Sequence, residues 1–133
     1  MSKVRVLLAD DHANMRGMVN GILDPHFEVV GEVADGKSLI EAALELNPDV
    51  IVTDISMPIM NGIEAVKKLK EYGCRSRIIF LTVHSSKDFV QACLEAGASG
   101  HVVKAQMASD LLEAIRAALA GCIFVSTDLA YPI

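Results

Sequence analysis

Four expected strands of the sequence end in side chains that are suited to phosphate or metal chemistry. Each stretch has the length of a buried strand, and a polar residue follows it at once. The stretches and their polar ends are 4–9 with Asp10 and Asp11, 50–53 with Asp54, 78–81 with Thr82, and 101–103 with Lys104. Because the carboxyl ends of parallel strands share one edge of a sheet, where ligands bind, we expect these carboxylates, the hydroxyl and the ammonium to meet there.

This combination of groups is suited to phosphoryl transfer assisted by a metal ion. Carboxylates gathered at one edge repel one another, and a hard divalent cation removes that cost. Mg²⁺ is the natural occupant, because it is typically held by one or two carboxylates while it keeps waters and shares oxygens with a phosphoryl group. A carboxylate can also act as the nucleophile and form an aspartyl phosphate. We expect Asp54, which is followed by a Pro/Asn/Gly turn at 55–62, to be that nucleophile.

The elements that must position these residues alternate between strand and helix. The expected strands are 4–9, 27–34, 50–53, 77–82 and 100–103, and the expected helices are 12–24, 37–47, 62–72, 86–96 and 109–120. This alternation predicts the α/β class with a single doubly wound, five-stranded parallel sheet. The first, third and fourth strands are continuous apolar runs, as expected of strands covered on both faces. Glu28 and Glu32 interrupt the second strand, which predicts an edge position.

Helix ends are marked in the sequence as well. Asp110 and Glu113 form a capping-box pattern at the start of the last helix. Gly97 and Gly121 follow apolar helical stretches, and a proline follows the helix that ends near Asn47. These signals support the expected helix boundaries.

Composition limits the class of protein. A length of 133 residues with 52% hydrophobic residues suits one domain with a buried core. No apolar stretch approaches the roughly 18 residues of a spanning helix, so we expect a cytoplasmic protein without a membrane partner. The formal charge of -5 argues against direct binding to nucleic acid, which requires a basic face. Cys74, Cys93 and Cys122 are interpreted as reduced structural thiols.

The chain resembles the receiver domain of two-component response regulators, the phosphoacceptor module of these proteins. The resemblance spans nearly the whole chain and is carried by Asp10-Asp11, Asp54 with Met57-Pro58 and Asn61-Gly62, Thr82, Gly97-Ala98-Ser99-Gly100 and Lys104, in the family's order. It implies a flavodoxin-like (βα)5 fold with strand order 2-1-3-4-5. His12, the segment 81–84 and Ala105 after Lys104 resemble the branch whose members carry a helix-turn-helix DNA-binding domain.

The resemblance implies a role for each residue of the site. The implied ligands of Mg²⁺, or of Mn²⁺ in its place, are Asp10, Asp11, Asp54 and the backbone carbonyl of Ser56. Asp54 accepts the phosphoryl group, and Thr82 and Lys104 hold its oxygens. By this resemblance the domain is not an enzyme in the ordinary sense, because it catalyses only its own phosphotransfer and slow autodephosphorylation.

The resemblance also implies a conformational switch at Thr82 and at position 101. The family usually carries Tyr or Phe there, and this ring swings inward on phosphorylation, whereas this chain has His101. We expect His101 to act as a smaller rotating ring or to add pH sensitivity. Val83 is bulkier than the residue often found there, and we expect it to slow loss of the phosphoryl group. His12 and His84 flank the site, where a solvated loop histidine is the commoner explanation.

Domain organisation and partners follow from the same resemblance. Residues 1–121 are expected to form the receiver, and the tail at 122–133 resembles the linker to a DNA-binding effector domain that this chain does not include. The implied partners are a sensor histidine kinase or a histidine phosphotransfer protein, and a second copy of the chain on phosphorylation. DNA would be bound only through the separate domain. A stand-alone receiver that signals by docking to other proteins is the alternative.

Two other interpretations compete with a phosphoacceptor site. Asp10 and Asp11 are favoured helix-capping residues and by themselves would be read as a cap. The segment 31–38 matches the pattern G-x-x-x-x-G-K-[ST] of a P-loop NTPase. However, Glu32 and Asp35 would place negative charge where phosphates bind, so a strand through Gly31 followed by a turn is the preferred interpretation.

Overall fold

The computed structural model describes residues 3–83 and 86–126, which fold into alternating strands and helices. The strands are β1 (Arg5–Ala9), β2 (Glu28–Val33), β3 (Val50–Thr53), β4 (Arg77–Thr82), β5 (Gly100–Val103) and β6 (Phe124–Val125). The helices are α1 (Ala13–Leu23), α2 (Gly36–Leu46), α3 (Gly62–Glu71), α4 (Lys87–Glu95), the 3₁₀ turn η1 (Lys104–Gln106) and α5 (Met107–Leu119). The predicted α/β alternation is therefore confirmed.

The strands form one parallel sheet in the order β2-β1-β3-β4-β5-β6. The predicted order of the first five strands and the edge position of β2 are confirmed, but the prediction of five strands is wrong by one. Phe124 and Val125 pair with Gly100 and His101 along the open edge of β5. Two residues are too few for a periodic pattern, and their pairing depends on backbone groups, so the sequence carries no signal for β6.

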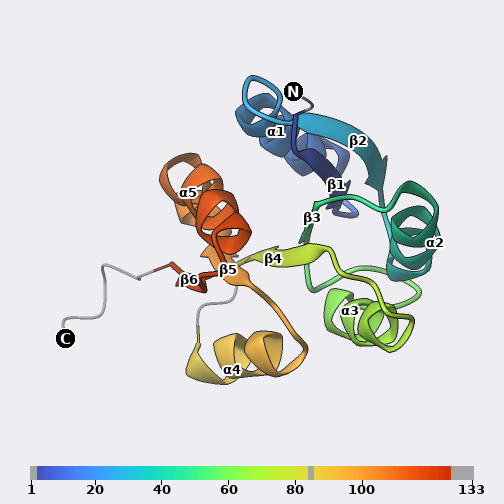
Figure 1. Ribbon diagram of the computed structural model, residues 1–133. Coiled ribbons are helices and arrows are strands. Elements are labelled where there is room, and N and C mark those ends of the chain that lie inside the picture. The colour runs from blue at the N-terminus through green and yellow to red at the C-terminus, as the bar shows by residue number, and fades with distance from the viewer. Residues whose placement is uncertain (1–2, 84–85, 127–133) are drawn as a thin grey trace.

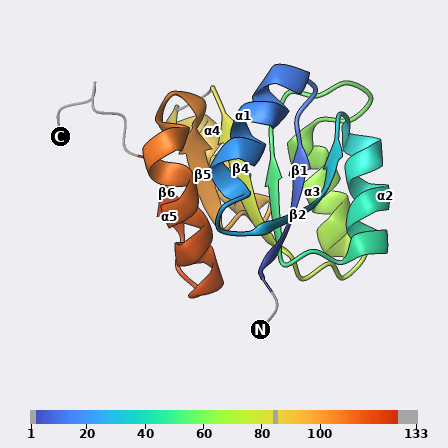
Figure 2. The same ribbon diagram turned by 90° about the horizontal axis from the view of Figure 1, so that it is seen from above.

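The sheet lies between two layers of helices (Figure 1, Figure 2). On one face α1 and α5 pack against the sheet, and on the other face α2, α3 and α4 do so. Strands β1, β3 and β4 are buried almost throughout, and Phe80 on β4 is one of the largest fully buried side chains. Burial on both faces explains why these three strands are continuous apolar runs in the sequence.

Most predicted helix ends are confirmed, with one exception. Asn47 has φ 48°, and Gly97 and Gly121 have φ 103° and 85°, so each takes the left-handed conformation that closes a helix. The prediction that Asp110 and Glu113 form a capping box is wrong, because α5 begins at Met107 and Asp110 lies inside its first turn. The turn η1 leads directly into α5 and moves its start upstream of the predicted cap.

The segment that matches the P-loop pattern does not form a phosphate-binding loop. Gly31 lies within β2 and pairs with Leu7 of β1. The Asp35 carboxylate caps α2, since its Oδ1 accepts a hydrogen bond of 2.7 Å from the Ser38 backbone N–H. A P-loop needs its backbone N–H groups free for phosphates, and here an acid already occupies one of them. The NTPase alternative is therefore wrong.

Two further observations bear on the class of protein. Within residues 3–83 and 86–126, no helix is both long and apolar enough to cross a membrane. Cys74, Cys93 and Cys122 are all free thiols, which agrees with their interpretation as reduced cysteines. Burial raises the pKa of the Cys93 thiol to about 11, so this thiol is unreactive at neutral pH.

Candidate functional site

The register of the sheet brings the acidic residues of β1 and β3 together. Ala9, the last residue of β1, pairs with Thr53, the last residue of β3, and the Asp54 N–H donates a 2.9 Å hydrogen bond to the Ala9 carbonyl. The residues that follow, Asp10 and Asp54, therefore leave the sheet side by side. Both are buried, with relative exposures of 2% and 6%. The predicted acidic edge is thus present in the structure.

Lys104 lies between these two carboxylates. Its Nζ is 2.9 Å from Asp10 Oδ2 and 2.9 Å from Asp54 Oδ2, and the Lys104 side chain is only 10% exposed. Burial alone would lower the pKa of Lys104, but hydrogen bonds and attraction from Asp54 and Asp10 outweigh it and raise the pKa above 10.5. Lys104 is therefore the ammonium counter-ion of the acidic edge.

The second oxygens of the buried carboxylates are held by backbone groups. Asp54 Oδ1 accepts a 2.7 Å hydrogen bond from the Ile55 N–H, and Asp10 Oδ1 accepts one of 2.9 Å from the His12 N–H. Asp10 thus does not cap α1, whose N-cap residue is His12. Asp11 differs from the other two acids, because 31% of its side chain is exposed. It is the carboxylate that solvent reaches most easily.

The acidic residues fit a divalent cation. Asp10, Asp11, His12 and Asp54 each offer a ligand atom within 4.8 Å of the others. On an ion with bonds of about 2.1 Å, opposite ligands are about 4.2 Å apart and adjacent ligands about 3.0 Å apart, so the four ligand atoms would have to move closer together to bind one ion. Three carboxylates and the Lys104 ammonium sum to a formal charge of -2 (three negative, one positive), which one divalent cation balances.

Thr82 completes the edge from the neighbouring strand. Thr82 ends β4 and pairs with Val103, the last residue of β5, which directly precedes Lys104. Thr82 is fully buried, whereas Val83, which follows it, is 69% exposed. The structure thus gathers the predicted acids, hydroxyl and ammonium at the carboxyl edge. Residue 84, the second histidine predicted to flank the site, lies outside the described residues.

The loop after Asp54 contains a strained turn that the sequence did not reveal. Ile59 has φ 70°, and the Met60 N–H donates a 2.7 Å hydrogen bond to the Pro58 carbonyl. This is a γ-turn with a positive central φ, which is rare and strained for a β-branched residue. Ser56, the predicted source of a carbonyl ligand, lies in the exposed part of this loop.

The loop can close only because two glycines permit a close approach of its backbone. A Cβ atom on Gly62 would collide with the carbonyl oxygen of Asp54, and a Cβ on Gly36 would collide with that of Met60. The Asn61 side chain caps α3, with its Oδ1 accepting a 2.9 Å hydrogen bond from the Glu64 N–H. The Asn-Gly pair therefore both starts α3 and fixes the backbone next to Asp54.

Arg16 is a positioning residue that sequence analysis did not single out. Its Nη1 donates a 2.7 Å hydrogen bond to the Asp10 carbonyl, and its Nε lies 3.5 Å from Glu32 Oε1 on β2. Arg16 thus ties α1 to the ends of β1 and β2 beside the acids. Its place on the first turn after the acidic pair is the only sequence signal that would have pointed to it.

His101 lies inside the protein. It belongs to β5, pairs with Phe80 of β4, and has no solvent exposure. The ring at the predicted switch position is therefore inward in this structure. Its role in a switch stays a prediction.

The segment after α5 is fastened beside the site by Ser126. The Val103 N–H donates a 3.1 Å hydrogen bond to Ser126 Oγ, and Ser126 Oγ donates one of 2.8 Å to Asp110 Oδ2. The Ser126 N–H also donates to the His101 carbonyl at 2.8 Å. The first residues of the predicted linker therefore contact the end of β5, one residue before Lys104. Residues 127–133 of that tail lie outside the described part of the chain.

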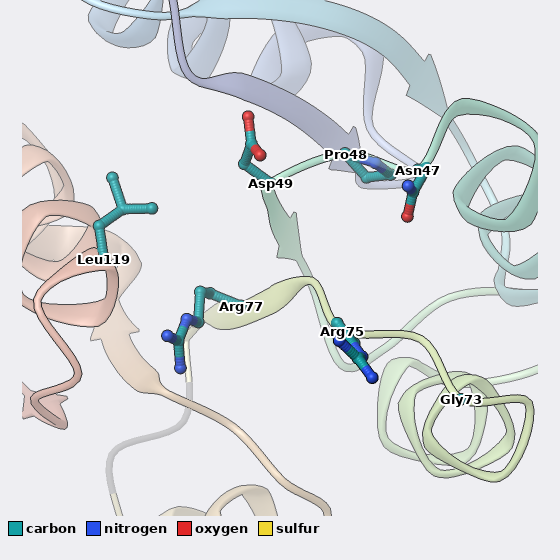
Figure 3. A pocket seen from close by; sticks show the side chains of 7 residues that line it. All are labelled: Asn47, Pro48, Asp49, Gly73, Arg75, Arg77 and Leu119. Atoms are coloured by element: carbon teal, nitrogen blue, oxygen red, sulfur yellow. The ribbon is translucent and has the colours of Figure 1, made fainter.

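A pocket of about 400 Å³ lies at the opposite edge of the sheet. Its lining residues are Asn47, Pro48, Asp49, Gly73, Arg75, Arg77 and Leu119 (Figure 3). They precede or begin β3 and β4, or end α5, whereas the acidic residues follow the strands. The side chains of Arg75 and Arg77 extend in different directions and do not converge on one point (Figure 3). This pocket is separate from the acidic site.

Known proteins are similar to this chain in sequence and in fold. Residues 6–116 match the family described as the response regulator receiver domain. The transcriptional regulatory protein DegU of Brevibacillus brevis is 35% identical over 132 residues, which cover 98% of this chain and 56% of DegU. The chemotaxis protein CheY of Bacillus subtilis (strain 168) is 39% identical over 116 residues, which cover 86% of this chain and 97% of CheY.

A solved structure agrees with these relatives. A two-component response regulator of the LuxR family from Aurantimonas sp. SI85-9A1 has a TM-score of 0.90 at 35% identity, covering 97% of this chain and 94% of that one. The chain spans little more than half of the length of DegU. The family match covers most of the sheet and every acidic, hydroxyl and ammonium residue of the site. The chain therefore belongs to the response regulator receiver family.

Proposed function

We propose that the protein is a phosphorylation-dependent signalling switch whose phosphoacceptor is Asp54. The observation that carries the proposal is the bridge from Lys104 Nζ to Asp10 and Asp54, at 2.9 Å from each carboxylate. It brings an ammonium and two carboxylates together at one sheet edge, and this supports their use as phosphate-binding group, nucleophile and metal ligand in phosphoryl transfer. Receiver domains are signalling domains and bind Mg²⁺ at such an acidic pocket.

The chemistry is a transfer to a carboxylate oxygen. An oxygen of Asp54 forms a bond to phosphorus, while the bond from phosphorus to the donor atom breaks and the donor keeps the electron pair. The donor is a phosphohistidine of a kinase or of a phosphotransfer protein. Asp10, Asp11, Asp54 and the Ser56 carbonyl would hold Mg²⁺, and the bound ion would supply positive charge against the repulsion between Asp54 and the phosphoryl oxygens. Lys104 and Thr82 hold those oxygens, and water later hydrolyses the aspartyl phosphate.

The signal arises because Lys104 must change partners. In this structure its ammonium contacts two carboxylates, and after phosphorylation it contacts a phosphoryl oxygen instead. Lys104 directly follows β5, which also holds His101 and pairs with β6. A shift of Lys104 therefore changes the balance between two conformations of the end of β5. Thr82 and His101 would change position together with it. To shift the ratio of active to inactive conformation from 1:99 to 99:1, the phosphoryl group must interact more favourably with the active conformation by about 5.5 kcal/mol.

The output surface in this proposal is the face of α4, β5 and α5. On phosphorylation this face binds a second copy of the chain or an effector domain. DegU is a transcriptional regulatory protein and is longer than this chain, which supports a transcriptional output through a DNA-binding domain joined after residue 121. CheY, in contrast, is matched over 97% of its length, so a stand-alone receiver that docks to other proteins is the second candidate.

The first test is the intact mass of the protein after incubation with a small acyl-phosphate donor and Mg²⁺. One added phosphoryl group is expected in the wild type and in Asp24→Asn, a matched control that alters an exposed acid at the end of α1. No adduct is expected in Asp54→Asn or when Mg²⁺ is chelated. An adduct that persists in Asp54→Asn would show that the nucleophile is another residue.

A second test concerns the lifetime of the adduct. The exposed Val83 side chain lies directly after Thr82, and we propose that it restricts the approach of water. Val83→Ala should therefore lose the phosphoryl group faster than the wild type under identical conditions. An unchanged lifetime would contradict this role for Val83.

A further inference from the structure

His12 directs a ring nitrogen into the acidic site. Its Nδ1 lies 3.1 Å from Asp11 Oδ1 and 3.4 Å from Asp10 Oδ1. The His12 side chain is 71% exposed, so packing against the core does not account for this orientation. His12 is the N-cap residue of α1 but makes no side-chain capping hydrogen bond. The ring nitrogen thus faces the carboxylates rather than the helix end.

We propose that His12 Nδ1 is a ligand of the divalent cation, beside Asp10, Asp11 and Asp54. The inference rests on the proposed metal site of the receiver and adds a nitrogen donor to a set of oxygen donors. Imidazole suits Co²⁺, Ni²⁺ and Zn²⁺, whereas Mg²⁺ prefers oxygen ligands and keeps its waters. His12 therefore makes this site a transition-metal centre as well as a Mg²⁺ centre, with higher affinity for Zn²⁺ and Co²⁺.

The geometry supports coordination by His12. The ligand atoms of His12 and the three acids all lie within 4.8 Å of one another. The backbone of His12 is fixed, because its N–H donates to Asp10 Oδ1 at 2.9 Å and its carbonyl accepts from the Arg16 N–H at 3.0 Å. Rotation of the exposed side chain is then the motion by which Nδ1 would approach a metal, to which imidazole bonds at about 2.0–2.1 Å.

Charge favours the same conclusion. The three carboxylates outnumber the single Lys104 ammonium at this edge. An uncharged imidazole ligand does not neutralise the carboxylates, so they still attract the cation. Its lone pair adds one more bond to the metal. Asp11 and His12 are the two exposed members of the cluster, which gives an ion a path from solvent.

The experiment compares metal affinities of the full chain, without a histidine tag, at pH 7.5. The variants are His12→Asn and the matched control His26→Asn, which alters an exposed histidine in the turn between α1 and β2. Zn²⁺ and Co²⁺ affinities are measured by competition with a chromophoric chelator, and Mg²⁺ affinity by titration monitored by NMR. His12→Asn should weaken Zn²⁺ and Co²⁺ binding at least about tenfold. It should change Mg²⁺ affinity less than about twofold, and His26→Asn should change neither.

A spectroscopic measurement identifies the donor atom. With ¹⁵N-labelled histidine, Zn²⁺ should shift the Nδ1 resonance of His12 and leave that of His26 in place. If His12→Asn binds Zn²⁺ and Co²⁺ as the wild type does, and no His12 nitrogen shifts, the ring is only a hydrogen-bond partner of Asp11 and the inference is overturned. Equal weakening of Mg²⁺, Zn²⁺ and Co²⁺ overturns it too, because such a loss reflects charge or geometry rather than a nitrogen ligand.

Failure of this inference is separable from failure of the proposed function. If the wild type binds Mg²⁺ and gains a phosphoryl group on Asp54 while His12→Asn keeps its Zn²⁺ affinity, only the role of His12 is lost. If the wild type binds no divalent cation and accepts no phosphoryl group, the proposed receiver chemistry itself fails, and the ligand role of His12 fails with it.

Discussion

The Lys104 ammonium and the Asp54 carboxylate form a direct ion pair, with Nζ 2.9 Å from Oδ2, although the two residues are 50 positions apart in the chain. The same nitrogen reaches Asp10 across a separation of 94 residues. Three strand ends are thus tied together at the one point where the phosphoryl group is proposed to bind. The pair links the stability of the fold to the chemistry of the site.

Replacing Lys104 by methionine should destabilise the protein. Asp10 and Asp54 would remain buried without the ammonium that both contact, so we expect the free energy of unfolding to fall by roughly 2–4 kcal/mol in urea titrations. Mg²⁺, or Asp54→Asn in the same background, should recover part of this loss by restoring charge balance. Lys37→Met, at an exposed lysine of α2, should change stability by less than about 0.5 kcal/mol.

The Lys104 contribution should also respond to pH in a definite direction. Because its pKa is raised above the ordinary value of 10.5, the stabilisation is complete below that pH and is lost as the pH rises through the higher folded-state pKa. The stability difference between the wild type and Lys104→Met should therefore be constant from pH 7 to 9 and shrink only at more alkaline pH. A difference that vanishes near neutrality would contradict the assigned ion pairs.

Replacing Gly62 by alanine should damage the loop that carries Asp54. The added Cβ would collide with the Asp54 carbonyl oxygen, so the backbone must move, and we expect a loss of about 2 kcal/mol or more. Phosphorylation by an acyl phosphate should slow as well, because Asp54 shifts. The control is Gly21→Ala in α1, where the new Cβ would meet no described atom within 4 Å apart from its chain neighbours and the nearby backbone of the helix, and it should stabilise the protein by about 0.5–1 kcal/mol.

Relieving the strained turn at Ile59 should stabilise the protein. Its positive φ costs roughly 1–3 kcal/mol, whereas glycine adopts it freely at an entropic cost of about 0.5–1 kcal/mol. Ile59 is 78% exposed, so little apolar contact is lost, and Ile59→Gly should raise the free energy of unfolding by about 1 kcal/mol. Ile123→Gly, at a 64% exposed isoleucine without a positive φ, should instead lower it. Urea titrations of both variants provide the comparison.

Removing the Ser126 hydroxyl should release β6 from the end of β5. Ser126→Ala leaves the Val103 N–H without its Ser126 acceptor and removes the hydrogen bond to Asp110 Oδ2, which should cost about 1–2 kcal/mol. Amide hydrogen exchange should accelerate at residues 103 and 126. Ser109→Ala is the control, because exposed Ser109 also contacts Asp110, at 3.1 Å, but supports no backbone N–H. Unchanged exchange at Val103 would argue against this fastening.

The thiols should differ in reactivity and in their pH dependence. Burial raises the pKa of Cys93 to about 11, so alkylation at pH 8 should be at least roughly a hundredfold slower at Cys93 than at exposed Cys122. Because the unfolded thiol titrates near 9.0, the Cys93 contribution to stability is present below that pH and is lost between pH 9 and about 11. Peptide mass mapping of the alkylated protein tests the difference in reactivity. The free energy of unfolding of the wild type and of Cys93→Ala, measured as a function of pH, tests the contribution to stability.

The alternating fold and the residues of the site were predictable from the sequence. Apolar runs at β1, β3 and β4 and polar residues directly after them follow from burial on both faces of a parallel sheet, a pattern that neighbouring residues carry. Asp10, Asp54, Thr82 and Lys104 could be placed at one edge because parallel strands share their carboxyl end. Helix ends at Asn47, Gly97 and Gly121 were likewise local signals.

Other features were decided only by the tertiary structure. The open edge of β5 decided three features: strand β6, the hydrogen bonds of Ser126 and the contact of Asp110 with Ser126. Strand pairing uses backbone groups, which all residue types except proline share, so the sequence does not indicate it. The γ-turn at Ile59 contradicts the preference of a β-branched residue and persists because the surrounding loop is held by Gly36 and Gly62.

The sequence by itself determined which groups meet at the sheet edge, because strand polarity and burial are encoded by neighbouring residues. The three-dimensional packing decided which of these groups contact each other, because it places Lys104 between Asp10 and Asp54. Electrostatic contacts depend on distances between residues far apart in the chain, and these distances exist only once the sheet has formed.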